Sequence, residues 1–147
     1  MSYKSPVHVT ACLRVWGDEV IPAEIARILG AEPTMSYRKG DVHVGKVTGR
    51  AHTRATGVWI RKSQLARVVP LEQHFSTLLA QVTSDLSIWD QLHAHYKIDV
   101  FCGLFIDTHS MNQVLDLSPQ MLRMLADRHV ALILDCYGRG DRSTDAE

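Results

Sequence analysis

The chain has 147 residues, a length typical of one domain. Hydrophobic residues make up 46% and charged residues 22%, which excludes a disordered or low-complexity chain. Sixteen Lys and Arg balance sixteen Asp and Glu, so a histone-like polycation is also excluded. No apolar run approaches the roughly 18 residues of a membrane span, and no secretory signal pattern is visible. We therefore expect one soluble cytoplasmic domain over residues 1–137, a polar tail over 138–147, and no membrane partner.

The first half of the chain predicts a strand, a helix and two further strands. Apolar and mixed residues alternate from Val7 to Trp16, the period of a strand with one buried face. Residues 22–30 have helical spacing, with a proline near the start and a glycine at the end. Residues 42–44 and 57–60 predict two strands, which we expect to pair as a hairpin across a loop from about Thr48 to Ala55.

The second half predicts helices on both sides of a buried strand. Pro70 opens a helix with an apolar stripe, and Ser84 or Asp85 can cap a second helical segment. Both alternation classes are apolar over residues 98–106, which predicts a central strand covered on both faces.

The last helix begins with Ser118 as its N-cap, and the sequence predicts that Leu122, Leu125 and Ala126 face inward. Residues 130–137 form the final strand. Short strands mixed with helices predict an α+β fold with a mixed or antiparallel sheet of about five strands and helices mainly on one face. A weak echo between the two strand-and-helix units favours a ferredoxin-like arrangement.

Charge is unevenly distributed along the chain. Eight Lys or Arg lie between Tyr37 and Val68 against a single acid, Asp41, whereas acids predominate after Val68. This basic segment predicts an electrostatic footprint for acidic or phosphate-bearing partners. The alternative is that its charges only protect the edges of an exposed hairpin. The candidate partner-binding or anion-binding residues are Arg38, Lys39, Arg50, Arg54, Arg61 and Trp59.

Signatures of known catalytic and cofactor sites are missing. The sequence contains no GxSxG elbow, no phosphate-binding loop and no GxGxxG motif. His93 and His95 are the closest histidine pair, but on a helix they point to different sides. The three cysteines are widely spaced in apolar stretches and are typical of reduced thiols. We therefore expect no catalytic residue, no metal ligand and no cofactor.

A set of short motifs, taken together, resembles a bacterial family, the domain of unknown function 4279. The motifs are Pro22-Ala23-Glu24-Ile25, Leu29-Gly30, Glu32-Pro33-Thr34, Arg38-Lys39-Gly40-Asp41, Gly57-Val58-Trp59, Leu71-Glu72-Gln73-His74, Leu78-Leu79, Leu117-Ser118-Pro119 and Asp135-Cys136-Tyr137. The resemblance spans residues 9–137 and implies a stand-alone bacterial α+β domain without an established activity. This chain is more basic than the family's usual pattern between Lys46 and Arg67.

These observations lead to a functional expectation with two alternatives. The expectation is a non-enzymatic protein-binding module, monomer or homodimer, with an immunity-type role that neutralises a toxin by occlusion. The first alternative is binding of nucleic acid or a phosphate ligand through residues 37–68. The second is a small enzyme with a site assembled from scattered His, Asp and Arg.

Overall fold

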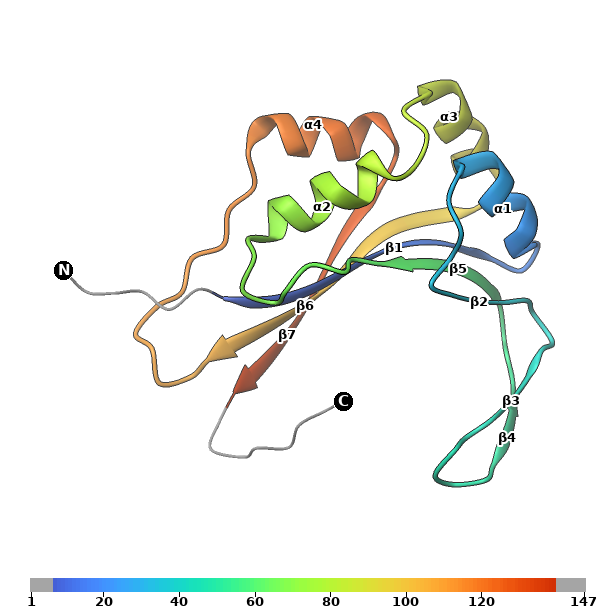
Figure 1. The fold of residues 1–147 in the computed structure, drawn as a ribbon, viewed down its shortest axis with the longest axis horizontal. Coiled ribbons are helices and arrows are strands. Elements are labelled where there is room, and N and C mark those ends of the chain that lie inside the picture. The colour runs from blue at the N-terminus through green and yellow to red at the C-terminus, as the bar shows by residue number, and fades with distance from the viewer. Residues whose placement is uncertain (1–6, 140–147) are drawn as a thin grey trace.

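The structure is a computed structural model that describes residues 7–139 (Figure 1). Seven strands and four helices are formed within this range. In chain order they are β1 (His8–Gly17), α1 (Pro22–Leu29), β2 (Met35–Tyr37), β3 (Val42–Val44), β4 (Ala51–Thr53), β5 (Gly57–Lys62), α2 (Leu71–Ala80), α3 (Leu86–His95), β6 (Lys97–Asp107), α4 (Pro119–Asp127) and β7 (Ala131–Arg139).

Five strands form one mixed sheet in the order β2-β5-β1-β6-β7. β6 and β7 are parallel, and the other neighbouring pairs are antiparallel. All four helices lie on the same face of this sheet (Figure 1). The predicted fold class is therefore confirmed. Within this fold class, α4 connects β6 to β7, and these two strands are neighbours in the sheet. In a ferredoxin-like fold, a further strand lies between the two strands that such a helix connects.

The predicted hairpin between residues 42–44 and 57–60 is wrong. β3 pairs instead with β4, and β5 lies inside the main sheet between β1 and β2. The physical reason is burial. Val58, Trp59 and Ile60 put apolar side chains on both faces of β5, which favours an internal strand, whereas the β3 side chains are exposed.

The core lies between the sheet and the helices. Its strand side comes from the helix-facing positions of β1, β5 and β6, and its helix side from one stripe of each helix. Trp59, Trp89 and Phe75 are the largest fully buried side chains. Each large apolar side chain buried in this way stabilises the fold by about 1.5–3 kcal/mol.

Helix boundaries follow local signals in the sequence. Asp85 accepts a hydrogen bond from the backbone N–H of Ser87, so of the two candidates Ser84 and Asp85 it is Asp85 that caps α3. Ser118 accepts a hydrogen bond from the backbone N–H of Met121, which confirms it as the N-cap of α4. Gly30 ends α1 with φ of 76°, a left-handed conformation that glycine adopts without a Cβ clash.

The predicted inward face of α4 needs a correction. Met121 and Leu125 are buried, whereas Leu122 is 49% exposed and Ala126 is exposed. Met121 and Leu125 are four residues apart and therefore share one face, so only a narrow stripe of α4 reaches the core.

The final strand continues to Arg139, two residues beyond the expected domain limit. The remainder of the predicted tail, residues 140–147, lies outside the described residues. Within residues 7–139, no helix has the length and apolar character needed to cross a lipid bilayer.

Candidate functional site

The sheet has one face without helices, which we call the open face. Strand alternation and register define its side chains, because the odd-numbered residues of β1 point toward the helices. The open face comprises His8, Thr10, Cys12, Arg14 and Trp16 of β1, Met35 and Tyr37 of β2, Val58, Ile60 and Lys62 of β5, Lys97, Asp99, Phe101, Gly103, Phe105 and Asp107 of β6, and Ala131, Ile133, Asp135 and Tyr137 of β7.

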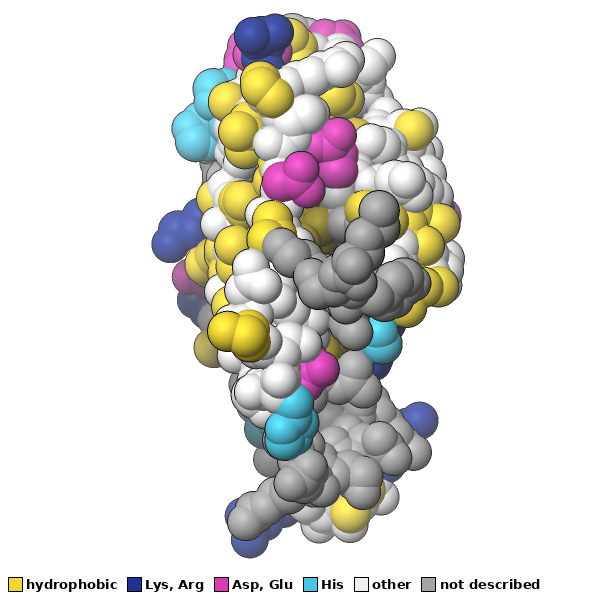
Figure 2. Space-filling model, turned by 90° about the vertical axis from the view of Figure 1, so that its left-hand side faces the viewer, with side chains coloured by type: hydrophobic (Ala, Val, Ile, Leu, Met, Phe, Trp, Pro, Cys, Tyr) yellow, Lys and Arg dark blue, Asp and Glu magenta, His cyan; other side chains and the backbone are white. Residues whose placement is uncertain are grey.

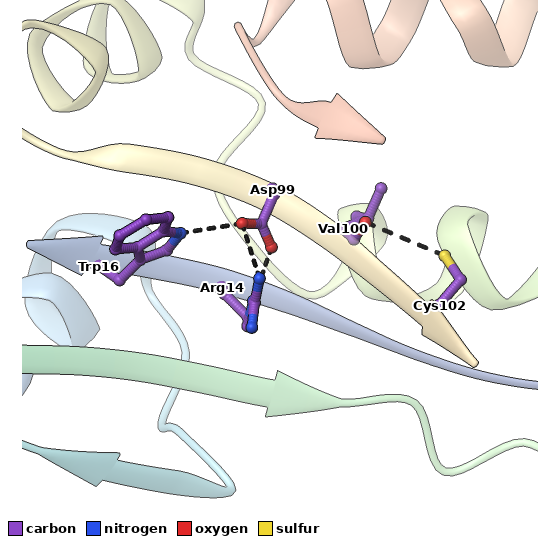
Figure 3. A network of polar contacts seen from close by, with 5 residues as sticks. All are labelled: Arg14, Trp16, Asp99, Val100 and Cys102. Carbon is purple, nitrogen blue, oxygen red and sulfur yellow. Dashed lines mark hydrogen bonds and ion pairs between the residues drawn. The ribbon is translucent and has the colours of Figure 1, made fainter. Parts of the chain in front are cut away.

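A buried carboxylate lies in the middle of the open face. Asp99 is 2% exposed and accepts hydrogen bonds from Arg14 Nε (2.7 Å), Arg14 Nη2 (3.0 Å) and Trp16 Nε1 (2.8 Å) (Figure 3). The hydrogen bonds to Asp99 raise the pKa of Arg14 above its ordinary value. This paired geometry fixes the plane of the guanidinium group while part of the Arg14 side chain stays exposed.

Cations lie over four aromatic rings of the open face. The Cζ atom of Arg14 lies 4.5 Å from the ring centre of Phe101, and the Nζ atom of Lys97 lies 4.7 Å from the ring centre of Trp16. The same arrangement joins Arg54 to Tyr37 at 4.0 Å and Arg67 to Phe105 at 4.8 Å. The cations are therefore held against the surface by cation–π attraction.

The far end of the open face, along β7, is more apolar. The rings of Phe105 and Tyr137 stack with centres 5.5 Å apart. The Tyr137 hydroxyl donates a 2.5 Å hydrogen bond to Asp135, and this bond raises the pKa of Tyr137.

The second sheet belongs to an extension that we call the arm, residues 38–56. It projects from the β2–β5 edge on the side away from the helices, so the arm and the open face lie on the same side of the sheet (Figure 1). Asp41 accepts the backbone N–H of Arg38, and the backbone of Arg54 bonds both Gly40 and Asp41. These contacts join the two sides of the arm where it leaves the sheet.

A surface ion pair connects the arm to the end of β1. Lys39 Nζ lies 3.1 Å from Asp18 Oδ2. Hydrogen bonds from Lys39 and Thr56, together with the charge of Lys39, hold the pKa of Asp18 below its ordinary value. Next to this pair, an open pocket of about 430 Å³ is lined by Trp16, Gly17, Asp18, Thr56, His93, Ala94, His95, Tyr96 and Lys97.

The two sides of the molecule carry opposite charge. The open face, the arm and Arg67 hold nine Lys or Arg, against the acids Asp18, Asp41, Asp99, Asp107 and Asp135. The helices and the segments joining them hold eight acids: Glu19, Glu24, Glu32, Glu72, Asp85, Asp90, Asp116 and Asp127. Against these stand Arg27, Arg61, Arg123 and Arg128. The charge imbalance of the sequence thus becomes a separation in space.

The six predicted binding residues occupy three different environments. Arg38, Lys39, Arg50 and Arg54 all belong to the arm.

Trp59 is 0% exposed and belongs to the core, so it offers no surface to a partner. Arg61 points to the helix side, where it donates hydrogen bonds to Gln81 Oε1 and to the Glu32 carbonyl. Trp59 therefore needs correcting in the predicted set. Arg61 stays a predicted binding residue, but strand alternation places it on the helix-facing side of β5, away from the open face.

Sequence reasoning missed the open-face residues Arg14, Trp16, Lys97, Asp99 and Phe101. A signal was present, because the mixed face of the first strand contains both an arginine and a tryptophan. Its meaning depended on knowing that helices cover only the other face.

A buried histidine lies on the helix side of the sheet. His74 is 1% exposed, and its Nε2 lies 3.1 Å from the Val69 carbonyl, which can only accept a hydrogen bond. In neutral His74, Nδ1 then accepts the Ser63 hydroxyl at 2.6 Å. Ser63 Oγ also accepts the backbone N–H of Leu65, so the pair anchors the connection between β5 and α2.

The fold and surface define the class of protein: a small α+β domain with a helix-free sheet face and a basic arm. The chain belongs to the family described as a domain of unknown function (DUF4279), whose model matches residues 6–139. The resemblance seen in the sequence motifs is confirmed. No curated protein and no solved structure matches the chain significantly.

Proposed function

We propose that this protein is a non-enzymatic binding module of the bacterial cytoplasm that binds an acidic protein through its open face and arm. The observation that supports this most is the charge separation across the sheet. Basic groups gather on the helix-free side, mainly on the arm, and acidic groups predominate on the helical side. A surface of this kind orients the module toward an acidic partner and accelerates association.

The open face contains residue types that are typical of high-affinity protein–protein interfaces. Residues that contribute most to protein–protein affinity are enriched in Trp, Tyr and Arg. Here Trp16, Tyr37 and Arg14 lie on the same face. Because Arg14 is held by Asp99, little side-chain entropy is lost when a partner carboxylate binds its exposed part.

The covered aromatic rings favour a protein over a nucleic acid. Binding of single-stranded nucleic acid relies on aromatic rings on which bases stack. On this face a cation already lies over each of Trp16, Tyr37, Phe101 and Phe105. These rings position positive charge for carboxylates.

An immunity-type role is the specific form of this proposal. The open face and the arm would cover an acidic face of a toxin and block access to its active site. Occlusion needs shape and charge complementarity and no catalytic group on the module.

The test is capture of partners from the native host by the tagged full chain at moderate salt, with and without nuclease. A second bait carries Lys46→Glu and Arg50→Glu at the tip of the arm, where both residues are exposed. The matched control is Arg27→Glu with Arg123→Glu, because these residues are exposed on the helices and the change in charge is the same.

We expect a stoichiometric acidic protein that survives nuclease treatment. With this partner purified, the arm variant should bind at least about tenfold more weakly than the control, and wild-type affinity should fall as salt rises. Bound material that disappears with nuclease would overturn the proposal in favour of nucleic acid. Equal affinity of the two variants would remove the arm from the interface.

A further inference from the structure

The two edges of the main sheet are built differently. One edge is β2, with three residues, and there the chain leaves the sheet toward the cations Arg38 and Lys39. The other edge is β7, with nine residues. From Ala131 to Arg139 the charged residues are Asp135 and, at the end of the strand, Arg139, and there is no Lys and no Pro. Shortness, charge and proline are the usual protections of an edge strand, and β7 has almost none of them.

β7 is apolar on both of its faces. On the helix side Leu132 is 38% and Leu134 is 46% exposed, and Leu122 of α4 is 49% exposed. On the open face Tyr137 is 49% exposed. Figure 2 shows hydrophobic side chains exposed among polar ones on the end of the molecule that lies at the left of Figure 1. No strand among residues 7–139 pairs with the outer edge of β7.

We propose that β7 pairs with β7 of a second copy of this chain, antiparallel and around a two-fold axis. Directly opposite residues of antiparallel strands face the same side, so the axis must pass through a residue position. An axis at Asp135 is disfavoured, because it would place two Asp135 carboxylates opposite each other.

Coverage of the exposed hydrophobic side chains decides between the neighbouring positions. An axis at Cys136 would place Leu134 opposite Gly138 of the second copy. An axis at Leu134 places the two Leu134 side chains opposite each other and Leu132 opposite Cys136 of the second copy. In this register Asp135 faces Ile133 of the second copy, so no like charges meet. Of these two registers, the one with its axis at Leu134 covers the exposed leucines better.

This pairing has a consequence for the surface of the dimer. A two-fold axis perpendicular to the sheet joins two five-stranded sheets into one sheet of ten strands, with both open faces on the same side. The β2 edges, and with them the arms, lie at the two ends. The stacked Phe105 and Tyr137 rings then lie near the centre of the combined face.

The oligomeric state of the full chain tests the proposal. We expect sedimentation velocity over a range of concentrations to show a reversible dimer. Leu134→Lys should raise the dimer dissociation constant at least tenfold, because it places two lysines opposite each other at the axis. The matched control is Val47→Lys, since Val47 is 98% exposed on the arm. A monomer at every concentration, or a dimer that Leu134→Lys leaves intact, would overturn the proposal.

Cross-linking tests the register. Leu134→Cys in a Cys136→Ser background should form a disulfide-linked dimer when diamide oxidises the two thiols, because opposite residues lie within disulfide reach. Val47→Cys in the same background should remain largely monomeric. A cross-link through Cys136 of the unmodified chain, without one through Leu134→Cys, would overturn the proposed register and move the axis to Cys136.

Discussion

The two faces of the central sheet differ in how their residues are used. On the helix-covered face, β1 contributes Val9, Leu13 and Val15, all 0% exposed. On the open face, the same strand contributes Arg14 and Trp16, which bond a buried carboxylate. A single strand therefore supplies the packed core with one set of alternate residues and a polar surface with the other. Substitutions on the two faces should have separable effects on stability and on binding.

The largest effect is expected in the core. Trp59→Ala removes a fully buried indole and should lower the free energy of unfolding by about 3–5 kcal/mol. Urea unfolding followed by circular dichroism measures this loss. Trp59→Phe is the matched control and should cost much less. It keeps most of the apolar volume and removes an indole N–H that has no hydrogen-bond partner among the described residues. A loss below about 1 kcal/mol for Trp59→Ala would contradict the core assignment.

The next effect tests the open face. Asp99→Asn removes the charge that pairs with Arg14 and should destabilise the fold by roughly 2–3 kcal/mol, less than for a fully buried pair because Arg14 is partly exposed. The control is Asp135→Asn on the same face, where the bond to Tyr137 is exposed, with an expected cost below about 1 kcal/mol. Equal losses for the two variants would show that the Asp99 network has no special role.

A smaller effect should appear in the pH dependence of stability. Burial lowers the pKa of His74 below its ordinary value of 6.5. The unfolded chain then takes up the proton first as the pH falls, so this contribution is complete above pH 6.5 and is lost below it. The slope from one proton is at most about 1.4 kcal/mol per pH unit. In urea unfolding between pH 7.5 and 5, His74→Gln should be less stable at neutral pH and should lose less stability on acidification. An unchanged slope would contradict this account.

The smallest effect on stability is expected at the arm. Lys46→Glu and Arg50→Glu change exposed side chains and should each alter the free energy of unfolding by less than about 0.5 kcal/mol. Thermal and urea unfolding both measure this. If these variants bind the partner more weakly, as proposed above, while their free energy of unfolding is nearly unchanged, the arm contributes to binding and not to the stability of the fold. A loss above about 1 kcal/mol would instead assign the arm a structural role.

Local patterns in the sequence were sufficient for most elements. The alternation of the first strand, the N-caps Asp85 and Ser118 and the glycine at the end of α1 all lie where the pattern indicated. β2 and β4 each have three residues, too few to establish a period, and neither has the pair of valines that marked the equally short β3. The face of α4 was misjudged because helix rotation depends on the neighbouring elements.

The candidate surface was predictable in part, and the division has a physical cause. The basic segment and the excess of acids that follows it are features of the linear sequence and can be counted along the chain. Arg14 and Asp99 are 85 positions apart, and they meet because β1 and β6 are neighbours in the sheet. Pairing between distant strands is decided by burial of the whole sheet against its helices. The amino-acid sequence alone therefore located the basic segment, and the pairing of distant strands decided which residues lie together on the open face.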